Sequence, residues 1–224
     1  MTRKPTLVCI FAHPDDEAFG PAGTIHKLTK THDVYILCAT KGQAGQDSFE
    51  ESKDSLTKRR AQELRLSAKI LGVKKVYFMG FKDGTLSNNI YHKLADKIKK
   101  HLNVLNPEIV ITFEPHGISG HIDHIVVSMV TTFVFLKMPS IKELWYVVTL
   151  KERAVKMRDY FIYFPPGYSK DEVDKIVDVS DVWDTKVKAM LVHESQKHDA
   201  QRILKSHDKH PKEEYFLIRK HDKL

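Results

Sequence analysis

A histidine, two aspartates and a glutamate follow an apolar run near the start of the chain. The run covers residues 7–11, and the polar cluster is His13, Asp15, Asp16 and Glu17. A short run rich in β-forming residues indicates a buried strand. Burying such a cluster costs on the order of several kcal/mol unless its members are paired or bind a cation. The sequence therefore predicts a metal site at the carboxyl edge of a sheet, where open α/β folds place their ligands.

A second polar cluster follows another strand-like run, at residues 109–113. It holds His121, Asp123 and His124 behind two glycines. Imidazole and carboxylate are good Zn²⁺ ligands, and a catalytic zinc takes three protein ligands and keeps one position open. His13, Asp16 and His124 would supply two nitrogens and one carboxylate. Asp15 and His121 would then remain beside the metal for acid–base work, as metal-assisted hydrolysis requires.

Strand-like runs that alternate with helical stretches position these clusters. Strands are expected at Thr6–Ala12, Val34–Ala39, Val76–Met79, Ile109–Phe113 and Leu144–Thr149. Helices are expected at Lys58–Leu71, Ile90–Leu105 and Asp123–Leu136, and the segment Glu17–Lys30 is expected to become helical around Gly23. This alternation predicts βαβ units. We therefore expect a single Rossmann-like α/β domain over residues 1–224, with a mostly parallel sheet flanked by helices.

The last third of the chain is less regular. Tyr160–Phe164 reads as a strand or a loop, Val182–Lys205 as a helix, and Tyr215–Arg219 as an edge strand.

Composition excludes several classes of protein. The 224 residues bear a net charge of +7 without a nucleic-acid-binding signature, so no nucleic-acid partner is expected. No apolar run is long enough to span a membrane, and the N-terminus does not read as a secretory signal, so the cytoplasm is expected. Cys9 and Cys38 lie in apolar runs and are expected to be buried free thiols. A homo-oligomer is possible.

The paired motifs resemble the LmbE-like, or PIG-L-like, N-acetylglucosaminyl de-N-acetylase superfamily. The resemblance rests on Ala-His-Pro-Asp-Asp-Glu at residues 12–17 and Gly-His-x-Asp-His at 120–124. Weaker matches are the segments 19–24, 40–42, 60–64, 71–73 and 193–196, so the likeness covers residues 6 to 198. Two positions depart from the usual pattern: Ile122 replaces a common proline, and Ser119 stands where some sugar deacetylases have a tyrosine.

The resemblance implies a role for each residue of the two motifs. His13, Asp16 and His124 would bind Zn²⁺, although Fe²⁺ or Co²⁺ also suits such a site. Asp15 would act as the general base on the attacking water. His121 would stabilise the oxyanion or protonate the leaving amine.

Further residues are implied as supports or substrate contacts. Asp123 would orient a neighbouring imidazole, and Arg60, Lys41 and His193 would contact the substrate. Simpler interpretations stay open for each. Asp123 could be a helix N-cap, Lys41 part of an ordinary turn, Arg60 and Glu63 a solvated helix pair, and His193 a surface histidine. The tail histidines His207, His210 and His221 are expected to be solvated.

The expected function is zinc-dependent removal of acetyl from an N-acetylglucosamine-type sugar or conjugate, a small-molecule substrate. One alternative is a metal-dependent amidase acting on a non-sugar amide. Another is a metal- or ligand-binding protein without turnover, against which the intact Asp15 and His121 argue. The loops at 43–57, 82–90 and 150–180 are expected to set specificity, and their sequences contain no readable code.

Overall fold

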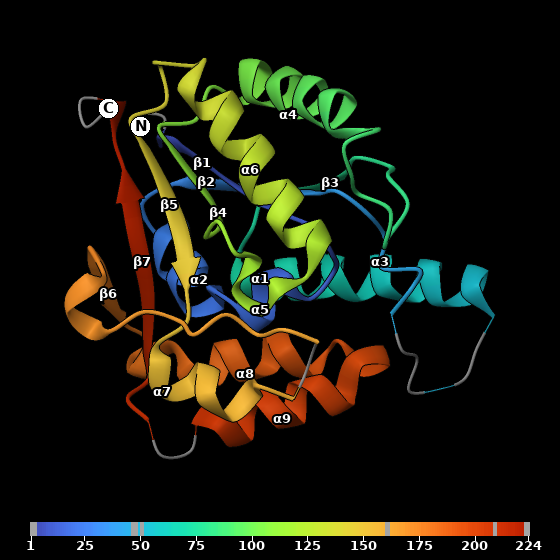
Figure 1. Ribbon diagram of the computed structural model, residues 1–224, viewed down its shortest axis with the longest axis vertical. Coiled ribbons are helices and arrows are strands. Elements are labelled where there is room, and N and C mark those ends of the chain that lie inside the picture. Colours follow the sequence, from blue (N-terminus) through green and yellow to red (C-terminus); the bar gives the residue numbers. More distant parts are fainter. Residues whose placement is uncertain (1–3, 46–48, 50–51, 160–161, 208–209, 222–224) are drawn as a thin grey trace.

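The computed structural model describes residues 4–45, 49, 52–159, 162–207 and 210–221. Its centre is a seven-stranded sheet in the order β3-β2-β1-β4-β5-β7-β6 (Figure 1). The strands are β1 (Thr6–Phe11), β2 (Asp33–Cys38), β3 (Lys75–Phe78), β4 (Ile109–Phe113), β5 (Glu143–Val148), β6 (Lys175–Asp178) and β7 (Glu213–Arg219). The first five pair in parallel, and β7 pairs antiparallel with β5 and β6. The expected α/β fold with a mostly parallel sheet is confirmed.

Helices cover both faces of the sheet. They are α1 (Asp16–Phe19), α2 (Ala22–Thr29), α3 (Lys53–Leu71), α4 (Tyr91–Leu105), α5 (Gly117–Gly120), α6 (Ile122–Leu136), α7 (Lys151–Ala154), α8 (Trp183–Leu191) and α9 (Lys197–His207). Helices α4 and α6 pack together on one face, and α2, α3 and α8 pack together on the other (Figure 1). In the sheet, β2 and β3 lie on one side of β1, and β4 and β5 lie on the other, so the strand order reverses between β1 and β4. Open α/β sheets bind their ligands at such a switch point.

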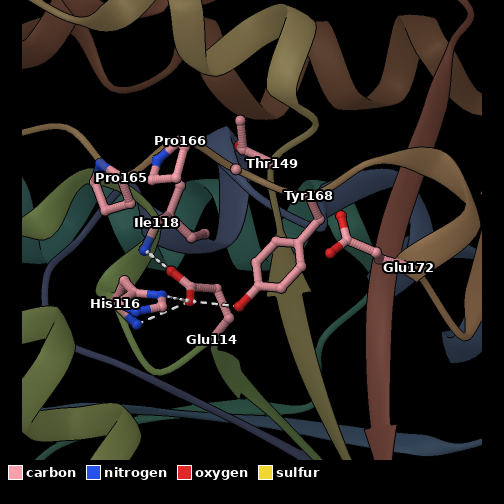
Figure 2. Close-up of a pocket in the computed structure, with 9 residues that line it drawn as sticks. Glu114, His116, Ile118, Thr149, Pro165, Pro166, Tyr168 and Glu172 are labelled. Carbon is pink, nitrogen blue, oxygen red and sulfur yellow. Dashed lines mark hydrogen bonds and ion pairs between the residues drawn. The ribbon is translucent and has the colours of Figure 1, made fainter.

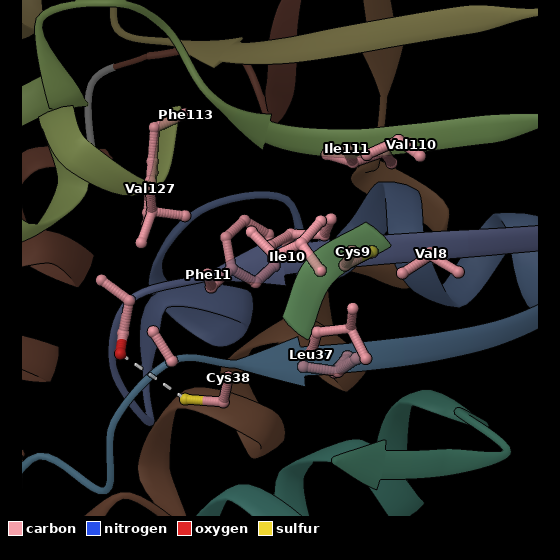
Figure 3. Close-up of a cluster of buried hydrophobic side chains, with 14 of the residues drawn as sticks. Val8, Cys9, Ile10, Phe11, Leu37, Cys38, Val110, Ile111, Phe113 and Val127 are labelled. Carbon is pink, nitrogen blue, oxygen red and sulfur yellow. Dashed lines mark hydrogen bonds between the residues drawn. The ribbon is translucent and has the colours of Figure 1, made fainter. Parts of the chain in front are cut away.

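The core lies on and around β1, whose six residues are all buried. Figure 3 shows Ile10 and Phe11 of β1 among side chains of the neighbouring strands β2 and β4. A strand buried on both faces reads as a continuous apolar run, which is why the sequence identified it. Cys9 and Cys38 are buried free thiols, as expected, and burial raises the pKa of both.

The C-terminal elements differ from the expectations in two ways. The segment expected to be the edge strand is β7, but it lies between β5 and β6, so β6 forms the edge. The expected helix 182–205 is broken into α8 and α9 by a 3₁₀ turn, Glu194–Gln196. For the segment 160–164, Tyr160 and Phe161 lie outside the described residues, and the other three residues are not in a strand.

A buried ion pair fastens β7 to the rest of the fold. Lys186 Nζ lies 2.6 Å from Glu214 Oε1, and both side chains are buried. The Glu214 carboxylate also accepts hydrogen bonds from the backbone N–H groups of Gly23 and Thr24 in the first turn of α2. Such an acceptor satisfies N–H groups that have no partner within their helix. Within the described part of the chain, no helix is long and apolar enough to cross a membrane.

Candidate metal centre and active site

The two sequence clusters meet where β1 and β4 end. The turn after β1 bears His13, Asp15 and Asp16, and the start of α6 bears His121 and His124. His13 lies 4.8 Å from His121 and 5.1 Å from His124 between ring centroids. The strand order places these turns side by side, although they are more than 100 residues apart in the chain.

Donor atoms of three residues approach one another at this point. Nδ1 of His13 lies 3.1 Å from Nε2 of His124, which lies 3.2 Å from Oδ1 of Asp16. The third separation, from His13 Nδ1 to Asp16 Oδ2, is 3.9 Å. Ligands about 2.0–2.2 Å from a tetrahedral Zn²⁺ are roughly 3.3 Å apart. The two separations from His124 Nε2 match this spacing, and the separation between His13 and Asp16 is longer.

Hydrogen bonds orient all three groups. Asp16 Oδ2 accepts from the backbone N–H groups of Ala12 and His13, at 3.1 and 2.7 Å. His124 Nδ1 lies 3.1 Å from the Gly117 carbonyl oxygen. The His124 hydrogen therefore belongs on Nδ1, and the lone pair of Nε2 faces the cluster. Partners of this kind fix the tautomer of metal-binding imidazoles.

The other nitrogen of His13 faces two carboxylates. Nε2 lies 2.9 Å from Asp83 Oδ1 and 3.3 Å from Asp123 Oδ2. His13, Asp83 and Asp123 form a second group of possible metal donors, besides His13, His121 and His124. Both carboxylates also accept hydrogen bonds from the backbone. The N–H of Ala44 donates to Asp83, and the N–H groups of Gly84 and Leu86 donate to Asp123. The Nε2 side of His13 thus faces Asp83 and Asp123, and its Nδ1 side faces Asp16 and His124.

Asp83 is the member of the site that sequence reasoning missed. It is buried in the loop after β3, within the segment 82–90 that was expected only to influence specificity. A detectable signal existed, because Asp83 and Gly84 follow the third parallel strand, at the same sheet edge as the other clusters. The Asp123 carboxylate lies near His13 Nε2, and its orienting role stays a prediction. The N-cap of α6 is His121, whose side chain accepts from the Asp123 N–H, so Asp123 is not the cap.

The surrounding charges make this point attractive to a cation. Burial opposes protonation of His13, but the carboxylates of Asp123 and Asp83 outweigh it and raise its pKa to about 10. Burial likewise opposes ionisation of Asp16, but His124 and His13 keep its pKa below the usual range. The imidazole of His13 is therefore surrounded by negative charge, from Asp83 and Asp123 at Nε2 and from Asp16 near Nδ1.

Asp15 is held beside this cluster in a strained backbone conformation. Its φ of 109° is rare for a residue with a side chain, and such a state costs about 1–3 kcal/mol. The Glu17 carboxylate accepts from its backbone N–H at 3.1 Å, and Arg60 Nη2 donates to its Oδ2 at 2.9 Å. Burial raises the pKa of Asp15, against the lowering effect of Arg60. The Asp15 carboxylate is therefore held in a fixed position and has a higher affinity for a proton than an exposed aspartate.

His121 is arranged as a neutral donor. Its Nδ1 accepts the backbone N–H of Asp123 at 3.1 Å, so Nε2 bears the hydrogen in the neutral ring. Burial, and then the neighbouring His124 and His13, lower its pKa to about 4. A neutral imidazole with its hydrogen on Nε2 can stabilise a developing negative charge on oxygen.

The three predicted substrate contacts lie in different environments. Lys41 is exposed in the loop after β2. Arg60 is buried, and besides Asp15 it donates to the carbonyl oxygens of Gly42 and Pro14, both at 2.8 Å. His193 is fully buried, with Nε2 2.8 Å from Glu17 Oε1. Substrate contact by these residues stays a prediction, and the structure gives Arg60 and His193 supporting roles behind Asp15.

Besides the N-cap role of Asp123, two more of the simpler interpretations are wrong. Arg60 and Glu63 are not a solvated pair, since Glu63 is buried and accepts from the N–H and hydroxyl of Ser195. His193 is not a surface residue. Glu17 also accepts from the Ser67 hydroxyl, at 2.5 Å. One face of α3 and the turn at 193–196 thus form a buried polar layer beneath Asp15.

Comparisons with known proteins identify the family of this chain. The family model for GlcNAc-PI de-N-acetylase, PIG-L, matches residues 8–135, more than half of the chain and all of both motifs. The chain belongs to the PIG-L family. Its relatives include the diacetylchitobiose deacetylase of Thermococcus kodakarensis, 32% identical over 195 residues that span 85% of this chain and 69% of the relative. A probable N-acetyl-alpha-D-glucosaminyl L-malate deacetylase 2 of Bacillus cereus is 29% identical over 85% of this chain and 83% of its own.

The fold of this PIG-L family member also has close structural counterparts. The N,N'-diacetylchitobiose deacetylase of Pyrococcus horikoshii, solved with an inhibitor, superposes with a TM-score of 0.75. That superposition covers 97% of this chain and 84% of the other, at 24% identity, and at this identity it supports the fold alone.

Proposed function

We propose that this protein is a metal-dependent de-N-acetylase. It would hydrolyse the acetamide of an N-acetylglucosamine-type sugar or conjugate to acetate and a free amine. Membership of the PIG-L family and the deacetylase names of its relatives support the reaction type. The observation that carries the proposal is that His13 Nδ1 and Asp16 Oδ1, in the same turn as Asp15, lie 3.1 and 3.2 Å from His124 Nε2. We further propose that residues 1–224 act as one deacetylase domain.

His13, Asp16 and His124 would hold the cation. Zn²⁺ is our first choice because two imidazoles and one carboxylate suit it, with Fe²⁺ or Co²⁺ as alternatives. A bound cation of this kind polarises the amide carbonyl and lowers the pKa of water. Asp83 and Asp123 would keep His13 oriented, since each lies within hydrogen-bonding distance of its Nε2.

The remaining residues would move protons. Asp15 would accept a proton from the attacking water, a role that suits a carboxylate whose pKa is raised by burial. Arg60 would hold that carboxylate in place during the transfer. His121 would donate from Nε2 to the carbonyl oxygen as negative charge develops there. The proton on Asp15 is then available to the nitrogen that leaves as an amine.

The test is an assay for released primary amine. Purified protein loaded with Zn²⁺, Fe²⁺ or Co²⁺ is incubated with N-acetylglucosamine, diacetylchitobiose and an N-acetylglucosaminyl conjugate, and with N-acetylated amino acids as non-sugar amides. We expect amine only from the sugars and only with metal. Release from the amino acids alone would favour the non-sugar amidase, and no release from any amide would leave a binding protein.

A further inference from the structure

A buried carboxylate behind the metal centre, Glu114, has no role in the reaction described above. It follows β4 directly and is 2% exposed. Its side chain forms the floor of a pocket of about 110 Å³ between the 116–118 turn and the segment 165–168 (Figure 2). Burial of a carboxylate needs compensating hydrogen bonds, and Glu114 has several.

Those hydrogen bonds hold one turn. Oε1 of Glu114 accepts the backbone N–H of Ile118 at 2.6 Å, and Oε2 accepts that of His116 at 2.8 Å. The His116 ring also contacts Oε2, at 3.0 Å from Nδ1. The hydroxyl of Tyr168, from a distant part of the chain, donates to the same oxygen at 3.1 Å (Figure 2). Every donor except Tyr168 belongs to the 116–118 turn.

The turn needs such support because its backbone is strained. Ile118 has φ 63° and ψ −54°, close to the values of a γ-turn that is rare for a β-branched residue. Gly117 also has a positive φ, and a Cβ there would lie 2.7 Å from the Cβ of His124. The turn is therefore packed directly against His124 and does not hold its shape through local preference.

The turn contacts the His124 ring through the backbone carbonyl group of Gly117. The oxygen of Gly117 faces Nδ1 of His124 at 3.1 Å, and Phe113 stacks on the same ring with a centroid distance of 4.1 Å. We propose that Glu114 is a positioning residue for the metal centre. It acts through the Gly117 carbonyl, which aims Nε2 of His124, and Tyr168 fixes its carboxylate. This inference rests on the proposed metal site, because it assigns His124 as a ligand.

The test measures metal affinity by competition with a chromophoric chelator, alongside thermal unfolding of the metal-free protein. Glu114→Gln keeps the shape of the side chain but removes one of its two acceptor oxygens. We expect Zn²⁺ affinity to fall about tenfold, the lower end of the range for losing a direct partner of a ligating histidine, because Glu114 acts through the Gly117 carbonyl. Tyr168→Phe removes a single hydroxyl and should lower the affinity by a smaller factor.

Glu172→Gln is the matched control. Glu172 lines the same pocket but bonds to Ser169 and Lys151 instead of the turn. This control should bind Zn²⁺ as the wild type does. Wild-type affinity in folded Glu114→Gln protein would overturn the inference, and if that variant does not fold, wild-type affinity in Tyr168→Phe would do so. A wild-type protein that binds no metal would instead overturn the proposed function.

Discussion

Arg60 donates from Nη2 to Oδ2 of Asp15 over 2.9 Å, and both residues are buried. The planar guanidinium also reaches two carbonyl oxygens, which a lysine ammonium cannot reproduce in the same geometry. We predict that Arg60→Lys lowers kcat about tenfold or more, because a charge-assisted hydrogen bond at the base is lost. Steady-state kinetics with metal content measured in parallel test this. Unchanged kcat would show that the ion pair is dispensable.

Substitutions of the adjacent residues Asp15 and Asp16 should impair different properties of the protein. Asp15→Asn should keep the metal and lose turnover about 10²- to 10⁴-fold, the usual contribution of a general base. Asp16→Asn should lose metal affinity first, because Asp16 Oδ1 faces His124 in the donor cluster. Metal titration and turnover on both variants separate the two roles. Equal loss of metal in both variants would contradict the division.

Gly42 should tolerate no side chain. Its φ is +68°, and a Cβ would lie 2.4 Å from Cζ of Arg60. We predict that Gly42→Ala displaces Arg60 and reproduces the kinetic loss of Arg60→Lys. The control is Gly80→Ala, which has a similar φ of +76° but whose Cβ would meet only the Lys97 amine at 3.9 Å. That variant should lose some stability and little kcat, and a parallel kcat loss would rule out an effect specific to Arg60.

His207 should make the fold sensitive to acid. It was expected to be solvated, yet it is 4% exposed and packs against Trp183. Burial first, and then Lys186 and Arg153, lower its pKa to about 2. Since the unfolded chain binds a proton near pH 6.5 and the folded chain does not, stability should fall as pH drops below 6.5.

Urea unfolding of the metal-free protein at pH 7 and pH 5 tests this prediction. His207→Leu should lose less stability between the two values than the wild type. His92→Leu, at an exposed position, serves as the control and should follow the wild type. If His207→Leu shows the same pH dependence as the wild type, the buried ring is not the source.

The parallel strands and the polar clusters that follow them were readable because each has a strong local signal. A buried parallel strand is a continuous apolar run, and polar residues at its end are conspicuous. The position of β7 was not readable, because its place between β5 and β6 depends on tertiary contacts such as the Lys186–Glu214 pair. The break between α8 and α9 was hidden for a similar reason: the side chains of His193 and Ser195 bond to Glu17 and Glu63.

The sequence does not indicate which charged residues on a helix are buried. Arg60 and Glu63 are one helical turn apart, which is also the spacing of a solvated ion pair. Their burial depends on tertiary contacts with Asp15 and Ser195, which the local sequence does not reveal. Asp83 shows the opposite case. It lies in a loop without a motif, and its importance comes from the orientation of His13 toward it.

The bond between Glu17 and His193 has a consequence for biosynthesis. The two residues are 176 positions apart, and the partner of His193 is the carboxylate that holds the backbone of Asp15. Both sequence motifs leave the ribosome long before this contact can form. A nascent chain that ends after α6 would contain every candidate ligand but would lack His193, the partner of Glu17. We therefore expect deacetylase activity to appear only when translation has passed the 193–196 turn.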